Sequence, residues 1–219
     1  MSDAPLVECR GAARTYGSGQ AATVALQPCD CEVRRGERIA VTGPSGSGKS
    51  TLLHLMAGLD LPTRGEVSWP ALGTRSALRP GPVAFVFQGP SLLPPLTVEE
   101  NVALPLTLAG VDGQAAAAAV RHALELVGLL DVRERLPEEI SGGQAQRAAV
   151  ARALAGEPDL ILADEPTGQL DREAATGVVE ALLAVADRSD SALVVATHDP
   201  GVAAALENRW QIHSGRLER

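Results

Sequence analysis

Four short apolar runs divide the chain, and each has the length of one buried strand. Runs of this kind, bounded by turn-forming residues, are typical of strands that are covered on both faces of a parallel sheet. Helical patterns lie between them, and alternating strands and helices characterise α/β proteins. The runs are residues 38–42, 83–87, 159–163 and 191–197.

Weaker patterns lie outside these runs. Residues 6–10 alternate and predict an edge strand, residues 14–19 predict a turn, and residues 24–33 predict a second strand. Residues 68–82 carry three prolines and two glycines, which predict an irregular loop. A closing hairpin is predicted over residues 210–217.

Two helices are predicted between the second and third apolar runs. Thr97 and Glu100 have the spacing of a capping box, so a helix begins after Thr97. Pro105 is expected to bend this helix. The next helix is predicted over residues 114–127, where five consecutive alanines favour it by propensity.

A glycine-rich loop joins the first apolar run to a helix, and it has the eight-position pattern of a phosphate-binding loop. Glycines let the backbone bend so that its N–H groups surround an anion, and the following helix directs its positive end at the same point. Lys49, the sole lysine, adds a cation, and Ser50 offers a hydroxyl to Mg²⁺. The alternative, a glycine-rich turn without a ligand, accounts poorly for the complete pattern. The loop consists of Gly43, Pro44, Ser45, Gly46, Ser47, Gly48, Lys49, Ser50 and Thr51.

Polar side chains follow the other three apolar runs. Gln88 ends the second, Asp164 and Glu165 end the third, and His198 ends the fourth. Ligands of open α/β sheets bind at the carboxyl ends of the strands. Two adjacent carboxylates there suit Mg²⁺ ligation and water activation, although an acidic turn is the plainer reading of the pair alone.

Ser141, Gly142, Gly143 and Gln144 open a further helix, with Ser141 as the expected N-cap. Two glycines at a helix start allow a second close approach to an anion. Tyr16 is the only tyrosine, and its position leaves two readings open: a ring that covers a sheet edge, or a ring that stacks on a nucleotide base.

Composition narrows the class of protein. The 219 residues carry a formal net charge of -8, which disfavours nucleic-acid binding because that relies on basic surface. No apolar segment reaches the roughly 18 residues of a membrane span, and the N-terminus lacks the pattern of a signal peptide. Cys9, Cys29 and Cys31 are too few and badly spaced for a zinc site, and are expected to be small buried thiols.

The sequence resembles the nucleotide-binding subunit of an ATP-binding cassette (ABC) system over nearly its whole length. Residues 140–144 with Gln146 and Arg147 are close to the Leu-Ser-Gly-Gly-Gln family signature, with Ile140 in place of the first leucine. The resemblance implies a P-loop NTPase (RecA-like) α/β core with a small antiparallel β subdomain and an inserted α-helical subdomain. It implies a single domain over residues 1–219, with the core and β subdomain in 1–88 and 157–219 and the helical subdomain in 89–156.

The resemblance also implies roles for the residues above. Tyr16 would stack on adenine, residues 43–51 would bind the phosphates of ATP, and Ser50, Gln88 and Asp164 would serve Mg²⁺. Glu165 would be the general base, with His198, Gln88 and Lys49 as further catalytic groups. Ser141, Gly142, Gly143 and Gln144 would meet ATP held by a second copy, in a head-to-tail dimer whose interface Asp171 crosses.

The implied partner is a separate integral membrane permease, which places the chain in the cytoplasm on the inner face of the membrane. Residues 56–66 and 92–102 resemble the lipoprotein-releasing, macrolide-exporting and cell-division group. Two alternatives are a soluble ABC ATPase with a role linked to nucleic acid, and a module that uses ATP as a regulatory switch. The acidic charge disfavours the first, and the presence of Glu165 and His198 disfavours the second.

Overall fold

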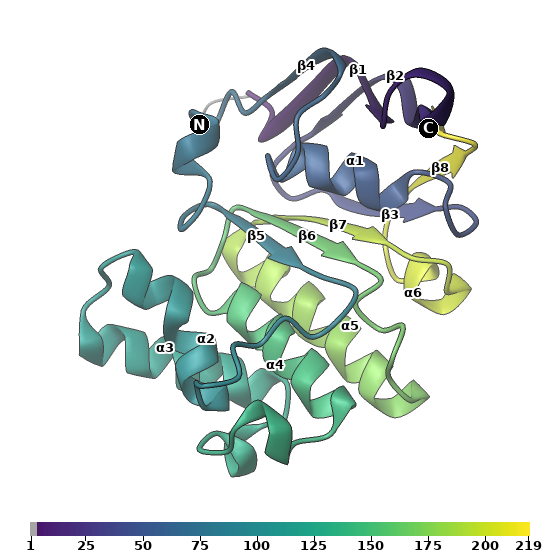
Figure 1. The fold of residues 1–219 in the computed structure, drawn as a ribbon. Helices are drawn as coiled ribbons and strands as arrows, with labels where there is room; N and C mark the ends of the chain where they lie inside the picture. The colour runs from purple at the N-terminus through teal and green to yellow at the C-terminus, as the bar shows by residue number, and fades with distance from the viewer. Residues whose placement is uncertain (1–3) are drawn as a thin grey trace.

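A six-stranded sheet forms the centre of the protein, for which the computed structural model describes residues 4–219 (Figure 1). Five neighbouring strands are parallel, and only the last, at the edge, is antiparallel. The four apolar runs are four adjacent strands of this sheet, as an α/β fold requires. In spatial order the strands are β5 (Val83–Val86), β6 (Leu160–Asp164), β7 (Ala192–Ala196), β3 (Arg38–Thr42), β8 (Asn208–His213) and β9 (Arg216–Glu218).

The second sheet has three antiparallel strands in the order β2 (Thr23–Val33), β1 (Val7–Tyr16) and β4 (Arg64–Ser68). Two predictions were wrong here. The first strand lies at the centre of its sheet, because β4 pairs with its outer side, and it continues through Tyr16 where a turn was expected. Irregular pairing with β2 interrupts the alternation along β1, which explains why the pattern was missed.

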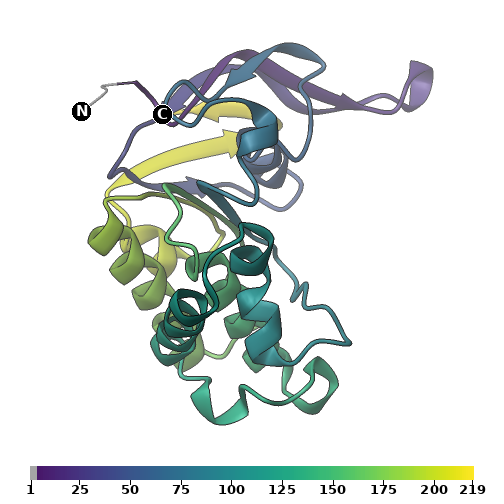
Figure 2. The ribbon, with the colours of Figure 1, turned by 90° about the vertical axis from the view of Figure 1, so that its left-hand side faces the viewer.

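Helices cover both faces of the central sheet. Helix α1 (Lys49–Met56) lies between the two sheets, whereas α5 (Arg172–Ser189) and α6 (Pro200–Ala204) lie on the opposite face (Figure 1). Helices α2 (Val98–Leu108), α3 (Gly113–Leu126) and α4 (Gly142–Leu154) form a lobe that extends away from the three-stranded sheet (Figure 2). Short 3-10 helices occupy Gly19–Ala21, Arg75–Ala77, Leu130–Val132 and Pro137–Glu139.

The central strands separate two hydrophobic cores. Ile39 and Val41 of β3 face the core around α1, whereas Ala40 between them faces the core under the helical lobe. In β6, Leu162 and Ile161 divide in the same way. Because successive side chains of a strand point to opposite faces, both must be apolar when both faces are covered. This explains the continuous apolar runs.

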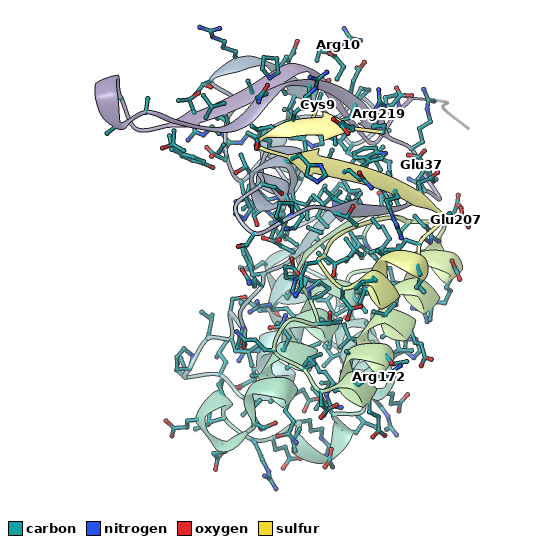
Figure 3. The ribbon with its side chains drawn as sticks, turned by 90° about the vertical axis from the view of Figure 1, so that its right-hand side faces the viewer. Cys9, Arg10, Glu37, Arg172, Glu207 and Arg219 are labelled. Atoms are coloured by element: carbon teal, nitrogen blue, oxygen red, sulfur yellow. The ribbon has the colours of Figure 1, made fainter. Side chains whose placement is uncertain are left out.

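The three cysteines are buried and unpaired in the core around α1. Cys9 lies opposite Cys31 in neighbouring strands of the three-stranded sheet, and Figure 3 labels Cys9 there. A hydrogen bond with Cys31 and burial both raise the pKa of Cys29. The expectation of small buried thiols is confirmed. The raised pKa keeps the Cys29 thiol protonated and unreactive.

The connection between β5 and α2 depends on one buried amide. The capping box of Thr97 and Glu100 is present, as predicted. Asn101, in the first turn of α2, is completely buried and accepts a hydrogen bond from the Leu93 N–H at 2.7 Å. Its amide nitrogen lies 2.9–3.1 Å from the carbonyl oxygens of Leu93, Leu96 and Thr97. One side chain therefore holds the irregular loop after Gln88 against the helix.

We expect Asn101→Ala to lower the free energy of unfolding by about 2–4 kcal/mol, because several backbone groups lose their partner at once. The measurement is urea unfolding followed by circular dichroism. Thr107→Ala, which removes an exposed hydrogen bond to Ala103 from the same helix, is the control and should cost less than about 0.5 kcal/mol. An Asn101→Ala protein as stable as the control would contradict this account.

Candidate active site

Four neighbouring strands end beside one another, and each end carries predicted functional residues. The phosphate loop follows β3, His198 follows β7, Asp164 ends β6 with Glu165 directly after it, and Gln88 follows β5. Backbone hydrogen bonds align these ends: the Thr197 N–H donates to the Val41 carbonyl at 3.0 Å, and the Glu165 N–H donates to the Ala196 carbonyl at 2.9 Å. The predicted convergence at the carboxyl edge of the sheet is confirmed.

The phosphate loop needs glycine at two points of close backbone approach. Gly43 has a φ of 149°, and a Cβ there would lie 2.1 Å from the carbonyl oxygen of Ile212. Gly48 has a φ of 113°, and a Cβ there would lie 2.4 Å from the carbonyl oxygen of Ala25. The loop is thus wedged between strands β8 and β2, so its N–H groups are held in place before any ligand arrives.

Lys49 is the first residue of α1 and is 6 % exposed. Its ammonium group donates to the carbonyl oxygens of Gly43 at 2.9 Å and Pro44 at 3.3 Å, both within the loop. The same nitrogen lies 3.6 Å from Glu165 Oε1. The single lysine of the chain is therefore held over the loop, with a carboxylate beside it.

Glu165 joins the phosphate loop to His198. Its Oε2 lies 2.8 Å from His198 Nδ1 and accepts a second hydrogen bond from the His198 backbone N–H at 3.4 Å. Glu165 is buried, whereas the His198 side chain is 71 % exposed. The backbone of Glu165 has a φ of 47°, an unusual value for a residue with a side chain, and such strain clusters at functional sites.

Asp164 is buried beside the phosphate loop. Burial raises the pKa of its carboxyl group, although a hydrogen bond with Ser50 and the charge of Lys49 oppose that effect. Its Oδ1 and the Ser47 hydroxyl are buried without a hydrogen-bond partner. Buried polar atoms are normally paired, so the two atoms mark places where ligand atoms fit.

The residues present suit a triphosphate with a magnesium ion. Among residues 4–219, no group of three or more His, Cys, Asp and Glu side chains could hold a metal by itself. Magnesium commonly binds through one or two carboxylates together with substrate phosphates, so Asp164 and Ser50 beside the loop form a donor set of the expected kind.

Several predicted residues lie apart from this cluster. Ser141 caps α4, as predicted, and its hydroxyl and the Gln144 side chain form a capping box. Asp171 caps α5 by accepting from the Ala174 N–H at 2.8 Å. Figure 3 labels the next residue, Arg172, in the lower part of the molecule, far from the three-stranded sheet. Helices α4 and α1 lie on opposite sides of the central sheet (Figure 1). Within one chain, Ser141, Gly142, Gly143 and Gln144 do not complete the phosphate site.

Gln88 and Tyr16 have exposed side chains, and the structure shows contacts beside Gln88 that the sequence patterns did not predict. Gln146 of α4 is completely buried and donates to the carbonyl of Phe87 at 3.1 Å, next to Gln88. Arg152, also in α4, donates to the Ser91 carbonyl at 2.8 Å. The acceptors, the carbonyls of Phe87 and Ser91, lie far from α4 in the sequence. Contacts of this kind leave no periodic pattern in the sequence, so the sequence could not predict them.

The comparisons with known proteins agree on one family. The family description "ABC transporter" matches residues 26–168. The lipoprotein-releasing system ATP-binding protein LolD of Bordetella pertussis is 42 % identical over 221 residues, covering 98 % of this chain and 96 % of that protein. LolD of Xylella fastidiosa is 41 % identical over 220 residues, covering 97 % and 92 %.

Solved structures give the same result. The dimeric structure of MJ0796, a bacterial ABC transporter cassette, superimposes with a TM-score of 0.90 at 35 % identity, covering 97 % of each chain. A dimeric post-hydrolysis state of MJ0796 bound to ADP and Pi gives a TM-score of 0.88 at 34 % identity, covering 97 % of this chain and 98 % of that one. The chain belongs to the ABC transporter family, and it is an ATP-binding and ATP-hydrolysing subunit with the P-loop NTPase fold.

We expect Asp164→Asn to stabilise the protein in the absence of nucleotide and metal. A raised pKa means that the folded state favours the protonated carboxyl, so ionisation at neutral pH costs free energy of folding. The melting temperature at pH 7.5 should rise by about 3 °C, corresponding to roughly 1 kcal/mol. The gain should shrink as the pH falls and the native carboxyl becomes protonated. Melting curves at several pH values make the measurement, with Asp131→Asn as the control at an exposed carboxylate. A gain that grows toward acidic pH would contradict the sign.

Proposed function

We propose that residues 43–51 bind the phosphates of ATP, with Ser50, Asp164 and Gln88 serving a magnesium ion. The buried cluster of Lys49, Glu165 and Asp164 at the end of adjacent strands is the observation that carries this assignment. When bound, the magnesium ion neutralises phosphate charge. Lys49 is placed to do the same for the outer phosphates, and the nearby N-terminus of α1 adds its positive dipole.

Glu165 is proposed as the general base. Its carboxylate is held between Lys49 and His198, and a base must be oriented in this way to accept a proton from an attacking water. His198 fixes one carboxylate oxygen and presents its exposed ring toward solvent, where it is placed to contact the outer phosphate. Catalysis of phosphoryl transfer is largely positioning and charge stabilisation, and these residues supply both.

A second copy of the chain is proposed to complete the site. Ser141, Gly142, Gly143 and Gln144 form an exposed or half-buried helix start that no group of the same chain's phosphate loop meets. Helix starts bind anions, so this one suits the ATP held by a partner copy, with Asp171 in the loop between the two sites. The dimeric form of the MJ0796 cassette supports a pair of copies.

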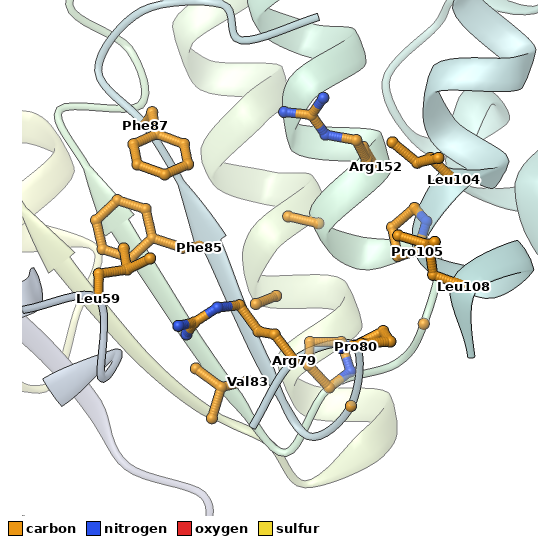
Figure 4. Close-up of a pocket in the computed structure, with 15 residues that line it drawn as sticks. Leu59, Arg79, Pro80, Val83, Phe85, Phe87, Leu104, Pro105, Leu108 and Arg152 are labelled. Atoms are coloured by element: carbon orange, nitrogen blue, oxygen red, sulfur yellow. The ribbon is translucent and has the colours of Figure 1, made fainter. Parts of the chain in front are cut away.

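A permease segment is the proposed occupant of an apolar groove beside Gln88 (Figure 4). The groove lies between the end of α2 and the strand β5, and its polar residues are few. Leu108 is 66 % exposed, and Phe87 and Leu59 are 38 % and 39 % exposed, which is unusual for large apolar residues in one place. The lining residues that Figure 4 labels are Leu59, Arg79, Pro80, Val83, Phe85, Phe87, Leu104, Pro105, Leu108 and Arg152.

The groove is linked to the signature helix. Gln146 holds the carbonyl of Phe87, and Arg152 reaches from α4 to Ser91, so a movement of α4 would displace the groove wall. When ATP brings two copies together, the resulting movement of α4 would in this way be transmitted to a permease segment docked in the groove. The relatives named for lipoprotein release support a permease of that type, and a place on the cytoplasmic face of the membrane follows from it. Among the described residues, no helix has the length and apolar character of a membrane span.

Glu165→Gln tests the catalytic assignment. We expect ATP binding to persist, hydrolysis to fall by at least about a hundred-fold, and a stable ATP-bound dimer to accumulate. Phosphate release and size-exclusion chromatography with and without ATP measure these effects. Lys49→Ala is the companion variant, and it should lose ATP affinity and therefore remain monomeric. Normal turnover by Glu165→Gln would remove Glu165 as the base, and normal ATP affinity of Lys49→Ala would remove the phosphate-loop assignment.

Leu108→Glu tests the docking groove. A charge in an apolar interface should reduce co-purification with the permease by at least about ten-fold, because the carboxylate must lose its water on docking. The tagged chain would be purified from detergent-solubilised membranes of its native host, and integral membrane proteins would be quantified by mass spectrometry. Val24→Glu, at an exposed apolar position outside the groove, is the control. If the same integral membrane protein is recovered in equal amounts with Leu108→Glu and with Val24→Glu, the permease does not dock in this groove.

A further inference from the structure

Tyr16 belongs to a closed set of three side chains that the proposed mechanism leaves unused. Its hydroxyl donates to Asp60 Oδ2 at 2.9 Å, and the guanidinium carbon of Arg14 lies 4.6 Å from the centroid of its ring. Arg14 Nε lies 2.8 Å from the same oxygen of Asp60. Each of the three side chains therefore contacts the other two, with Arg14 against one face of the ring.

Asp60 is itself anchored to the end of α1. Its Oδ1 accepts from the Leu61 N–H at 2.7 Å, and its own N–H donates to the carbonyl of His54, a residue of α1, at 3.2 Å. Burial alone would raise the pKa of Asp60, but the hydrogen bonds from Leu61 and Tyr16 and the charge of Arg14 lower it overall. Asp60 is therefore ionised at neutral pH and accepts both hydrogen bonds.

The segment after Asp60 also forms hydrogen bonds with the end of β1. The Thr63 N–H and hydroxyl both donate to the carbonyl of Ala13, at 2.8 and 3.1 Å. The Thr63 hydroxyl in turn accepts from the Thr15 N–H at 3.2 Å. The pairing of β1 with β2 shifts register between Arg14 and Thr15, so the sheet alone does not define this strand end. The contacts from Asp60 and Thr63 therefore fix the position of this strand end, which the irregular pairing with β2 leaves undefined.

The same strand end lies beside the phosphate loop. Tyr16 pairs with Thr23 of β2, and two residues further along β2 the carbonyl oxygen of Ala25 lies so close to Gly48 that a Cβ there would be 2.4 Å from it. Tyr16 is 40 % exposed although its hydroxyl and one ring face are engaged. An exposed aromatic surface thus stands near the phosphate site, and α1 connects the two: it begins at the loop and leads to Asp60.

We propose that Asp60 and Arg14 are positioning residues that hold the ring of Tyr16 as a platform for the adenine base of ATP. The inference rests on the proposed ATP site and on the family resemblance, which implies that Tyr16 stacks on adenine. A base gains more from a ring that is already ordered, because the ordering entropy is lost in the free protein and not on binding. Arg14 immobilises the ring by stacking on it, and Asp60 fixes its rotation through the hydroxyl.

The test compares ATP with inorganic tripolyphosphate, which fits the phosphate loop but carries no base. Binding to the full chain would be measured by calorimetry in magnesium-free buffer. Asp60→Ala and Tyr16→Phe should each weaken ATP about five-fold, the effect of losing about one net hydrogen bond, and should leave tripolyphosphate within about 1.5-fold. The double variant should bind ATP no more weakly than Asp60→Ala alone, because that variant has already lost the hydrogen bond from the Tyr16 hydroxyl.

Asp30→Ala is the matched control. The Asp30 carboxylate accepts from the Gly11 N–H at 2.7 Å in the same sheet, away from Tyr16, so its loss should leave the ratio of the two affinities unchanged. Arg14→Gln should likewise weaken ATP binding and spare tripolyphosphate, because it removes the guanidinium that stacks on the ring. Arg10→Gln is its control, since Arg10 lies on the same strand with its side chain 71 % exposed on the outer surface (Figure 3).

Three outcomes would overturn the inference: equal losses for ATP and tripolyphosphate, no loss for either, or tighter ATP binding by Asp60→Ala. The last would mean that Asp60 holds the ring away from the base. Tyr16→Phe removes a single oxygen atom and decides the matter if Asp60→Ala does not fold. Tyr16→Ala tests the underlying assignment separately: an unchanged affinity ratio there would remove Tyr16 as the base platform, whereas a changed ratio with a silent Asp60→Ala would remove only the positioning role.

Discussion

The alignment of four parallel strand ends is the constraint on which the rest of the structure depends. The backbone hydrogen bonds from Thr197 to Val41 and from Glu165 to Ala196 bring the ends of β3, β7 and β6 to the same level. A shift of one residue in either pairing would turn the side chains at the strand ends to the other face. The distance between Lys49 and Glu165 would then no longer allow an ion pair. Register is therefore what brings these charges together.

The same arrangement gathers groups that destabilise the fold as well as groups that carry the chemistry. Lys49, Asp164 and Glu165 are all less than a tenth exposed, and Asp164 lacks a partner on one oxygen. Buried charges and strained residues such as Glu165 destabilise a fold unless the surroundings are rigid. Here the two hydrophobic cores on either side of the sheet supply that rigidity, because each central strand contributes side chains to both. Polar groups that are poorly satisfied in the free protein are well placed for a charged ligand.

Coupling between parts of the chain depends on a few polar side chains that reach backbone groups. Gln146 joins the signature helix to the strand end that carries Gln88, and Asn101 holds the intervening loop against α2. Asp60 joins the far end of α1 to the strand that carries Tyr16. The phosphate loop is thus connected along α1 to the strand that carries Tyr16, and across the sheet to the strand end that carries Gln88. Neither connection sets the backbone conformation of the phosphate loop, because Gly43 and Gly48 pack directly against β8 and β2.

The sequence by itself determined the α/β class, the phosphate loop, the four buried strands and their polar ends, because each of these leaves a local pattern. Period-2 and period-3.6 patterning, capping residues and glycine spacing are properties of neighbouring residues. The central place of β1 in its sheet and its continuation to Tyr16 were not predictable in this way. Strand order depends on which distant segment pairs with each side, and β4 is far from β1 in the chain. Only the tertiary structure could bring Arg14 and Asp60 to Tyr16, and Gln146 to Phe87, because a hydrogen bond from a side chain to a distant backbone group imposes no periodicity on the sequence.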